Sequence, residues 1–233
     1  MDSETVQVAV PDGEFDCLLA RPASPEPAPV IIVLQEIFGV NPGIRSIARH
    51  YAGAGYLALS PDLFWRSERN SSMSEANPVH AARGFALYNE YDFDQGVDDI
   101  AAAIALARRL PGSSGKVGVT GYCLGGLLAY LAAARTDADA FVACYGGGTE
   151  RFVDRAAGIE APLLYHLAEE DEYIGAAAQR AIHAALAEVP SVTVRSYAGC
   201  NHAFARPGGS HFDAAQADLA NDRTDRFFAQ ILR

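Results

Sequence analysis

The sequence is short of positive charge, and this shortage limits the partners it can have. Eighteen Lys and Arg residues face 29 Asp and Glu residues, which gives a formal net charge of −11 at pH 7. Nucleic acids and anionic membrane surfaces bind basic faces of proteins. We therefore expect no nucleic-acid partner and no membrane partner, although one or two local arginines can still bind a small anionic substrate.

Long apolar runs, targeting signals and cysteine pairs are also missing. No apolar stretch reaches the roughly 18–20 residues that span a bilayer, and the acidic start at residues 1–4 lacks the apolar core of a signal peptide. No HExxH or Cys/His spacing indicates a zinc site, so we expect no metal and no cofactor. The four cysteines form no CxxC pair and are too sparse for a disulfide scaffold; they are Cys17, Cys123, Cys144 and Cys200. We expect a reduced, cytoplasmic protein, and a monomer because no unusual apolar stripe is present.

Apolar patterns alternate between strand and helix along the whole chain. Strands are expected at residues 6–10, 15–20, 30–34, 56–60, 116–120, 140–145, 162–167 and 192–197, and helices at 42–53, 78–90, 94–110, 124–135, 176–188 and 213–231. The first two strands form a hairpin. The β-branched run at 30–34 is typical of a parallel sheet covered on both faces. We predict one α/β domain over residues 1–233, with a mostly parallel sheet between helices.

The strongest local signal is the segment Gly121-Tyr122-Cys123-Leu124-Gly125-Gly126 between an expected strand and an expected helix. A nucleophile between glycines in this context is typical of a nucleophile elbow, because side chains two residues away would collide with the strand and helix. The next N–H, that of Leu124, can hold an oxyanion, and the helix dipole favours a thiolate. A dinucleotide turn is disfavoured because GxGxxG is absent. A structural cysteine in a tight turn remains an alternative.

A cysteine nucleophile needs a base that is oriented by an acid, and the elbow fold orders them nucleophile, acid, base. Asp171 follows the expected strand at 162–167, and His202 follows the strand at 192–197. Both therefore lie where a parallel sheet places active-site loops. Glu169, Glu170 and Glu172 are rivals to Asp171 that spacing alone does not exclude.

A further carboxylate, Glu36, follows the expected strand at 30–34. That strand should run beside the one that leads to Cys123, so Glu36 would lie near the thiol, where it can raise the thiol's pKa or take its proton. The N–H of Ile37 is then the natural second oxyanion donor. The other histidines are assigned no catalytic role: His166 should pack inside a strand, His50 and His183 lie on helices, and His80 and His211 are expected at the surface.

These residues resemble the dienelactone hydrolases (carboxymethylenebutenolidases). The similar pieces are Gln-Glu-Ile-Phe-Gly-Val-Asn at 35–41, Pro-Asp-Leu at 61–63, the elbow at 118–126, Asp171, and the segment 199–206 that contains His202. The similarity covers nearly the whole chain, and the combination of Glu36, Cys123, Asp171 and His202 is highly specific. An elbow alone would indicate only an α/β-hydrolase.

The resemblance implies an α/β-hydrolase fold and hydrolysis of an enol lactone, dienelactone, to maleylacetate in the breakdown of chlorinated catechols. It implies a Cys123–His202–Asp171 triad, a thiol held neutral by Glu36 until substrate binds, and oxyanion donors at Ile37 and Leu124. A thiolate oxidises easily, so forming it only with substrate protects it. The resemblance places Arg206 and Tyr145 at the substrate, and further candidates for the substrate pocket are Phe38, Phe85, Tyr88 and Arg83.

One departure from the family bears on the substrate. The family's second carboxylate-binding arginine aligns with Ala81, and Arg83 stands two residues later, out of helical phase. Ala203 follows His202 where a small hydroxyl residue is common in the family. A promiscuous carboxylesterase or thioesterase for activated esters therefore stays open. So does a non-catalytic ligand-binding or thiol-sensing protein on the same fold, although such a protein needs no oriented His–Asp pair.

Overall fold

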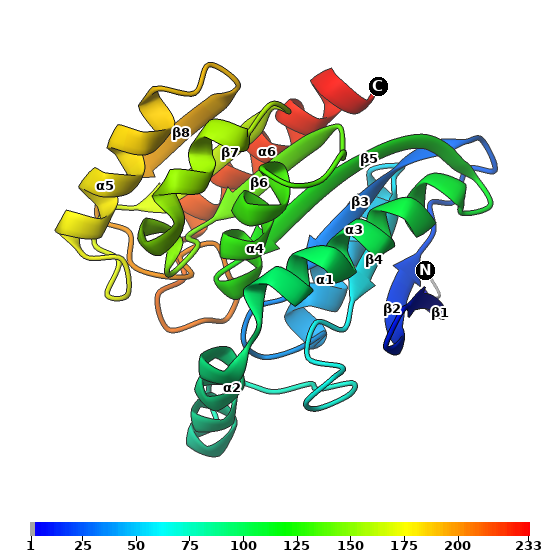
Figure 1. The fold of residues 1–233 in the computed structure, drawn as a ribbon, viewed down its shortest axis with the longest axis horizontal. Helices are drawn as coiled ribbons and strands as arrows, with labels where there is room; N and C mark the ends of the chain where they lie inside the picture. The colour runs from blue at the N-terminus through cyan, green and yellow to red at the C-terminus, as the bar shows by residue number, and fades with distance from the viewer. Residues whose placement is uncertain (1–2) are drawn as a thin grey trace. The chain divides into compact units, whose positions relative to one another are not determined.

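The computed structural model describes residues 3–233, which fall into two compact units. The first unit ends at Val119 and the second begins at Thr120. Figure 1 shows the strands and helices of both, coloured along the chain. None of the described helices is both long enough and apolar enough to cross a membrane. The single domain expected from the sequence stays a prediction.

In the first unit, an N-terminal hairpin adds to a pair of parallel strands. β1 (Ser3–Val10) and β2 (Gly13–Ala20) pair antiparallel, and β2 pairs antiparallel with β4 (Leu57–Pro61). β4 is parallel to β3 (Ala28–Leu34), in which every residue is buried. The strand order is β1-β2-β4-β3-β5, where β5 spans Ser113–Tyr122. The hairpin predicted from the alternating start of the chain is confirmed.

Three helices of the first unit begin where a side chain caps them. α1 (Pro42–Gly53), α2 (Pro78–Glu90) and α3 (Phe93–Arg109) follow the caps Asn41, Asn77 and Asp92, whose side-chain oxygens accept N–H groups of the first turn. Such caps satisfy backbone donors that have no partner inside the helix. α1 and α3 bury one apolar face, whereas α2 buries only Gly84 and Leu87.

The second unit has parallel strands with helices on both faces. β5 (Ser113–Tyr122) crosses the boundary between the two units. The next strands in the sheet are β6 (Ala140–Cys144), β7 (Leu163–Ala168) and β8 (Val192–Tyr197). β6 pairs parallel with β7, and β7 pairs parallel with β8. Its helices are α4 (Leu124–Ala133), α5 (Ala176–Ala187) and α6 (Ala214–Leu232). In Figure 1, α4 and α5 lie in front of these strands and α6 lies behind them.

The predicted elements are confirmed, with differences at their ends. β5 is longer than the strand expected at 116–120, because it begins among polar residues that apolar patterning does not mark. The 3-10 helix at Thr149–Gly158 was not expected. Its non-helical Phe152 interrupts the turns, and such a segment has no sustained helical period to recognise.

Candidate active site

Cys123 stands at a sharp turn between β5 and α4. Its backbone has φ 56° and ψ −114°, outside the conformations that a residue with a side chain normally adopts. The turn is held because the Cys123 N–H donates to the carbonyl of Cys144 at 3.1 Å and Leu127 N–H donates to the Cys123 carbonyl at 3.1 Å. Strain at a reactive residue indicates a functional constraint, as the elbow interpretation predicts.

The glycines of the elbow are required by close backbone approach. A Cβ on Gly121 would lie 2.0 Å from the carbonyl oxygen of Gly125, and a Cβ on Gly126 would lie 2.3 Å from that of Cys144. No side chain fits at these separations. The steric reason inferred from the sequence, which concerned residues two away from Cys123, therefore holds at Gly121, and a similar close approach requires a glycine at position 126.

Asp171 and His202 lie on the loops that follow β7 and β8 and are hydrogen-bonded to each other. His202 Nδ1 is 2.9 Å from Asp171 Oδ2 and 3.1 Å from Oδ1. Asp171 Oδ1 also accepts the N–H groups of Tyr173 at 2.8 Å and Ile174 at 3.1 Å. The Asp171 side chain is fully buried, and that of His202 is 7% exposed. The orientation of the Asp171 carboxylate is thus fixed by backbone N–H groups of its own loop as well as by His202.

The charges around His202 favour its protonated form. Burial alone lowers the pKa of His202, but the Cys123 side chain and the Asp171 carboxylate outweigh burial and raise the pKa to about 10. The Cys123 side chain is thus one cause of the raised pKa of the imidazole, and Nε2, the ring nitrogen that does not face Asp171, is buried with no hydrogen bond. The second unit therefore brings together the thiol, the imidazole and the carboxylate predicted from the sequence.

The three rival carboxylates do not take the place of Asp171. Glu169, Glu170 and Glu172 are exposed, and Asp171 is buried. Glu172 Oε1 instead lies 3.5 Å from Nδ1 of His211. The residue that faces His202 is Asp171.

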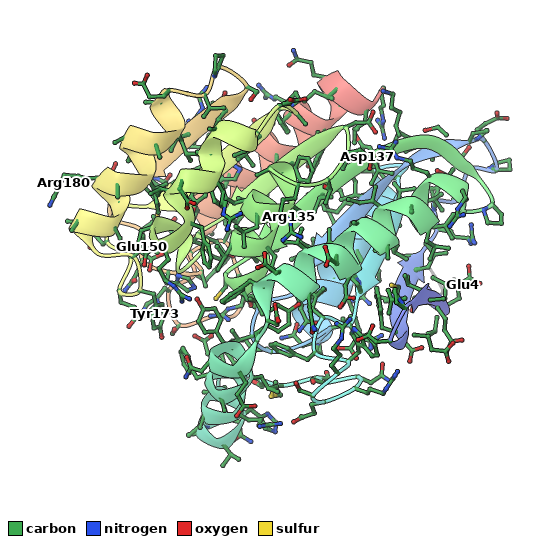
Figure 2. All side chains as sticks on the ribbon, in the orientation of Figure 1. Glu4, Arg135, Asp137, Glu150, Tyr173 and Arg180 are labelled. Atoms are coloured by element: carbon green, nitrogen blue, oxygen red, sulfur yellow. The ribbon has the colours of Figure 1, made fainter. Side chains whose placement is uncertain are left out.

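Two tyrosine rings flank the imidazole of His202. The buried Tyr145 lies edge-on at 5.2 Å between ring centroids, and Tyr173 lies edge-on at 4.8 Å. Tyr173 is half-exposed, on the loop between β7 and α5 (Figure 2). Tyr145 was predicted at the site, whereas Tyr173 was not. Only its place two residues after the acid could have suggested it.

Arg206 lies on the loop between β8 and α6. Its N–H donates to the carbonyl of Ala203, which has φ 59°, and the residue is half-buried. Arg206 thus shares a loop with His202, and its binding of a substrate carboxylate stays a prediction.

Leu124, the predicted oxyanion donor, is the first residue of α4. The other predicted site residues belong to the first unit and stay predictions as parts of the site. Glu36, Ile37 and Phe38 are buried directly after β3. On α2, the Arg83 guanidinium donates to Glu68 at 2.6 Å, Phe85 is 42% exposed, and the Tyr88 ring packs edge-on against Phe93. Arg83 thus already has a carboxylate partner within its own unit.

His166 packs inside β7, as expected. Its ring nitrogens lie 2.7 Å from the Tyr197 hydroxyl and 2.9 Å from the Thr224 hydroxyl. Burial lowers the pKa of His166 to about 3, so this histidine is neutral. Among residues 3–233, no group of three or more His, Cys, Asp and Glu side chains is arranged to hold a metal ion.

Comparison with known proteins gives the family. The model of the dienelactone hydrolase family matches residues 15–232. The carboxymethylenebutenolidase of Pseudomonas putida is 36% identical over 99% of this chain and 98% of its own length. Carboxymethylenebutenolidase 1 of Cupriavidus pinatubonensis is 35% identical over 94% and 93%.

Comparison with solved structures agrees with the sequence comparison. A crystal structure of a Klebsiella pneumoniae protein assigned as a dienelactone hydrolase matches with a TM-score of 0.84 and 27% identity, over 99% of this chain and all of that one. A dienelactone hydrolase-like promiscuous phosphotriesterase from metagenomic libraries matches in fold with a TM-score of 0.82, at 19% identity over 100% and 99% of the two chains. The chain has the α/β-hydrolase fold, is a hydrolase of ester or lactone bonds, and belongs to the dienelactone hydrolase family.

Proposed function

We propose that this enzyme hydrolyses dienelactone to maleylacetate through a Cys123–His202–Asp171 triad, within the breakdown of chlorinated catechols. The observation that carries the proposal is the hydrogen bond of 2.9 Å between His202 and Asp171, in the same unit as a cysteine held on a strained turn. An oriented imidazole beside a thiol is the arrangement that makes cysteine nucleophilic. The family supports the lactone as substrate.

The chemistry proceeds in two steps. His202 takes the Cys123 thiol proton, and the resulting thiolate attacks the lactone carbonyl. The carbonyl oxygen becomes an oxyanion beside the Leu124 N–H, and the ring C–O bond then breaks to leave a thioester. The leaving enolate takes the proton of the His202 imidazolium. Neutral His202 next removes a proton from water as the water oxygen adds to the thioester carbonyl. The C–S bond then breaks, which releases the acid and returns Cys123 as a thiolate beside the imidazolium, and the enol becomes the ketone. An enolate leaves readily, so activated esters and lactones are suited to this path and amides are not.

The experiment is to follow the loss of dienelactone absorbance with purified protein, with Cys123→Ala in parallel. We expect rapid loss with the wild type and none with the variant, at an unchanged circular dichroism spectrum. Cys123→Ser is the matched control, since it replaces the thiol with a hydroxyl of similar size. His202 deprotonates a hydroxyl less readily, because a hydroxyl is a weaker acid than a thiol. Undiminished activity in Cys123→Ala would contradict the triad.

A second candidate, a carboxylesterase for neutral activated esters, is favoured by the ion pair of 2.6 Å between Arg83 and Glu68. An arginine bound to a carboxylate of its own chain is less available to a substrate carboxylate. Arg206→Ala separates the two candidates on a neutral and an anionic ester with the same leaving group. A selective loss on the anionic ester supports the lactone hydrolase, and an equal effect on both supports the esterase.

Thiol sensing is tested on the same protein by alkylation of Cys123. A sensor has an exposed thiolate beside a resolving cysteine, whereas Cys144 and Cys200 are both buried. We expect slow alkylation that accelerates when a small carboxylate ligand is added. Fast alkylation of the ligand-free protein together with no ester cleavage would favour a sensor.

A further inference from the structure

The acid and the base of the proposed triad come from two separate loops whose tips must be held together. Asp171 follows β7 and His202 follows β8, 31 residues apart in the chain. Where the two loops begin, the Glu169 N–H donates to the Tyr197 carbonyl at 3.1 Å, and the Glu170 N–H donates to the Cys200 carbonyl at 2.8 Å. These backbone hydrogen bonds do not include Asp171 or His202, the residues that carry the proposed chemistry.

One side-chain oxygen continues the connection at the tips. Asn201 Oδ1 accepts the N–H of Glu172, next to the acid, at 2.9 Å, and the N–H of His202 itself at 2.6 Å. Two N–H donors that converge on one atom require an acceptor, so this atom is the amide oxygen and not the nitrogen. The orientation of the Asn201 amide follows from the backbone around it.

With the oxygen placed, the amide nitrogen of Asn201 faces His211. Nδ2 lies 3.5 Å from His211 Nε2, so Nε2 has to be the acceptor and the ring hydrogen is on Nδ1. Nδ1 then donates toward the His202 carbonyl at 3.3 Å, with Glu172 Oε1 at 3.5 Å from the same nitrogen. His211 in this tautomer holds Asn201 from one side and the His202 backbone from the other.

We propose that Asn201, held in its orientation by His211, is a positioning residue that fixes the loop of His202 against the loop of Asp171 and so sets the imidazole–carboxylate hydrogen bond. The inference rests on the proposed function and deepens it. Asn201 and His211 are positioning residues, because they act on the catalytic groups through the loops and not on the reacting atoms. Both were missed from the sequence, where His211 was expected only as a surface histidine.

The contacts indicate the size of the effect. Removal of the amide frees two backbone N–H groups on opposite loops, one of them on the base itself. A misplacement of about 1 Å at a catalytic group can cost roughly 100-fold in rate. We expect Asn201→Ala to lower kcat roughly 10- to 100-fold on a 4-nitrophenyl ester and to leave KM within about threefold.

The conservative variant separates positioning from packing. Asn201→Asp keeps an oxygen acceptor for both N–H groups and changes only the atom that faces His211. We expect it to recover kcat to within about threefold of the wild type. Ser191→Ala is the matched control, because it also removes one side-chain bond to the backbone, 2.9 Å to the Ile159 carbonyl. It should leave kcat unchanged.

A proton NMR measurement reports on the proposal without turnover. The His202 Nδ1 proton shared with Asp171 should give a downfield resonance, assigned by its loss in His202→Ala. We expect Asn201→Ala to broaden or shift this resonance and Asn201→Asp and Ser191→Ala to keep it. His211→Ala should give a smaller change in the same direction.

Two results would overturn the inference: an unaltered resonance and kcat in Asn201→Ala, or an Asn201→Asp variant as impaired as Asn201→Ala. Should Asn201→Ala fail to fold by circular dichroism, Asn201→Asp and His211→Ala still decide the matter. Failure of the proposed function is seen separately, as activity retained in Cys123→Ala, and it leaves the NMR result standing.

Discussion

Asp171→Asn is the substitution whose effect the structure defines most closely. Asp171 Oδ1 accepts the N–H groups of Tyr173 and Ile174, so the oxygen of an asparagine amide has to occupy that position. The amide nitrogen then replaces Oδ2, 2.9 Å from His202 Nδ1. The amide oxygen stays 3.1 Å from Nδ1 and the amide nitrogen lies nearer, at 2.9 Å, so we expect Nδ1 to accept from the nitrogen. The ring hydrogen then moves to Nε2, and the imidazole loses the lone pair that takes the thiol proton.

The magnitude follows from two terms. Loss of a hydrogen bond to a charged acceptor costs about 1.5–3 kcal/mol, and the wrong tautomer raises the total loss in kcat to roughly 10³- to 10⁴-fold, as in a serine-protease triad. The fold should survive, because both backbone N–H groups keep their acceptor. Asp171→Ala instead leaves them unsatisfied, which costs about 2–4 kcal/mol and lowers Tm by roughly 4–16 °C.

The assay is hydrolysis of a 4-nitrophenyl ester together with a thermal melt of each variant. Glu170→Gln is the control, since Glu170 is exposed and only its backbone meets the other loop. An Asp171→Asn enzyme within about tenfold of the wild type in kcat would refute the reasoning, since a misdirected imidazole cannot work at that rate.

Three further predictions concern stability. Gly121→Ala should cost more than about 3 kcal/mol of unfolding free energy because its Cβ would meet a carbonyl at 2.0 Å, whereas Gly147→Ala, with open space around it, should be neutral in a urea melt. The low pKa of His166, about 3, gives stability that is present above about pH 6.5 and lost as the pH falls toward 3; His166→Gln should flatten that acid limb in melts across pH. The raised pKa of His202, about 10, gives stability that is present below about pH 6.5 and lost as the pH rises through 10; Cys123→Ala should weaken this alkaline loss, and an unchanged slope would contradict the Cys123–His202 interaction.

Much of the fold could be predicted because its elements carry regular patterns. The buried run of β3 and the capped helix α1 have local signals, which are a β-branched stretch and an Asn-Pro start. The interrupted 3-10 helix at Thr149–Gly158 has neither signal. Its turns depend on contacts with distant residues, such as the Tyr130 hydroxyl that donates to the Phe152 carbonyl at 2.9 Å.

The residues of the candidate site also fall into those that local sequence signals predict and those that only the structure shows. Cys123, Asp171 and His202 were found because the elbow has a fixed spacing and the fold a fixed order of partners. Tyr173, Asn201 and His211 were missed because they act through contacts within and between loops. The Asn201 and His211 side chains meet backbone groups 29 and 9 residues away, and the Tyr173 ring meets the ring of His202. No period or motif marks such contacts, and the choice among the four acidic residues at 169–172 also needed the structure.

The most direct test of the account is to trap the acyl-enzyme. Wild-type protein mixed with an activated ester and quenched in acid should show by mass spectrometry a mass increase of one acyl group, which peptide mapping places on Cys123. The adduct should be absent from Cys123→Ala and should persist longer in His202→Ala, where the base for the attacking water is missing. Turnover without a Cys123 adduct, or an adduct on another residue, would contradict the central claim.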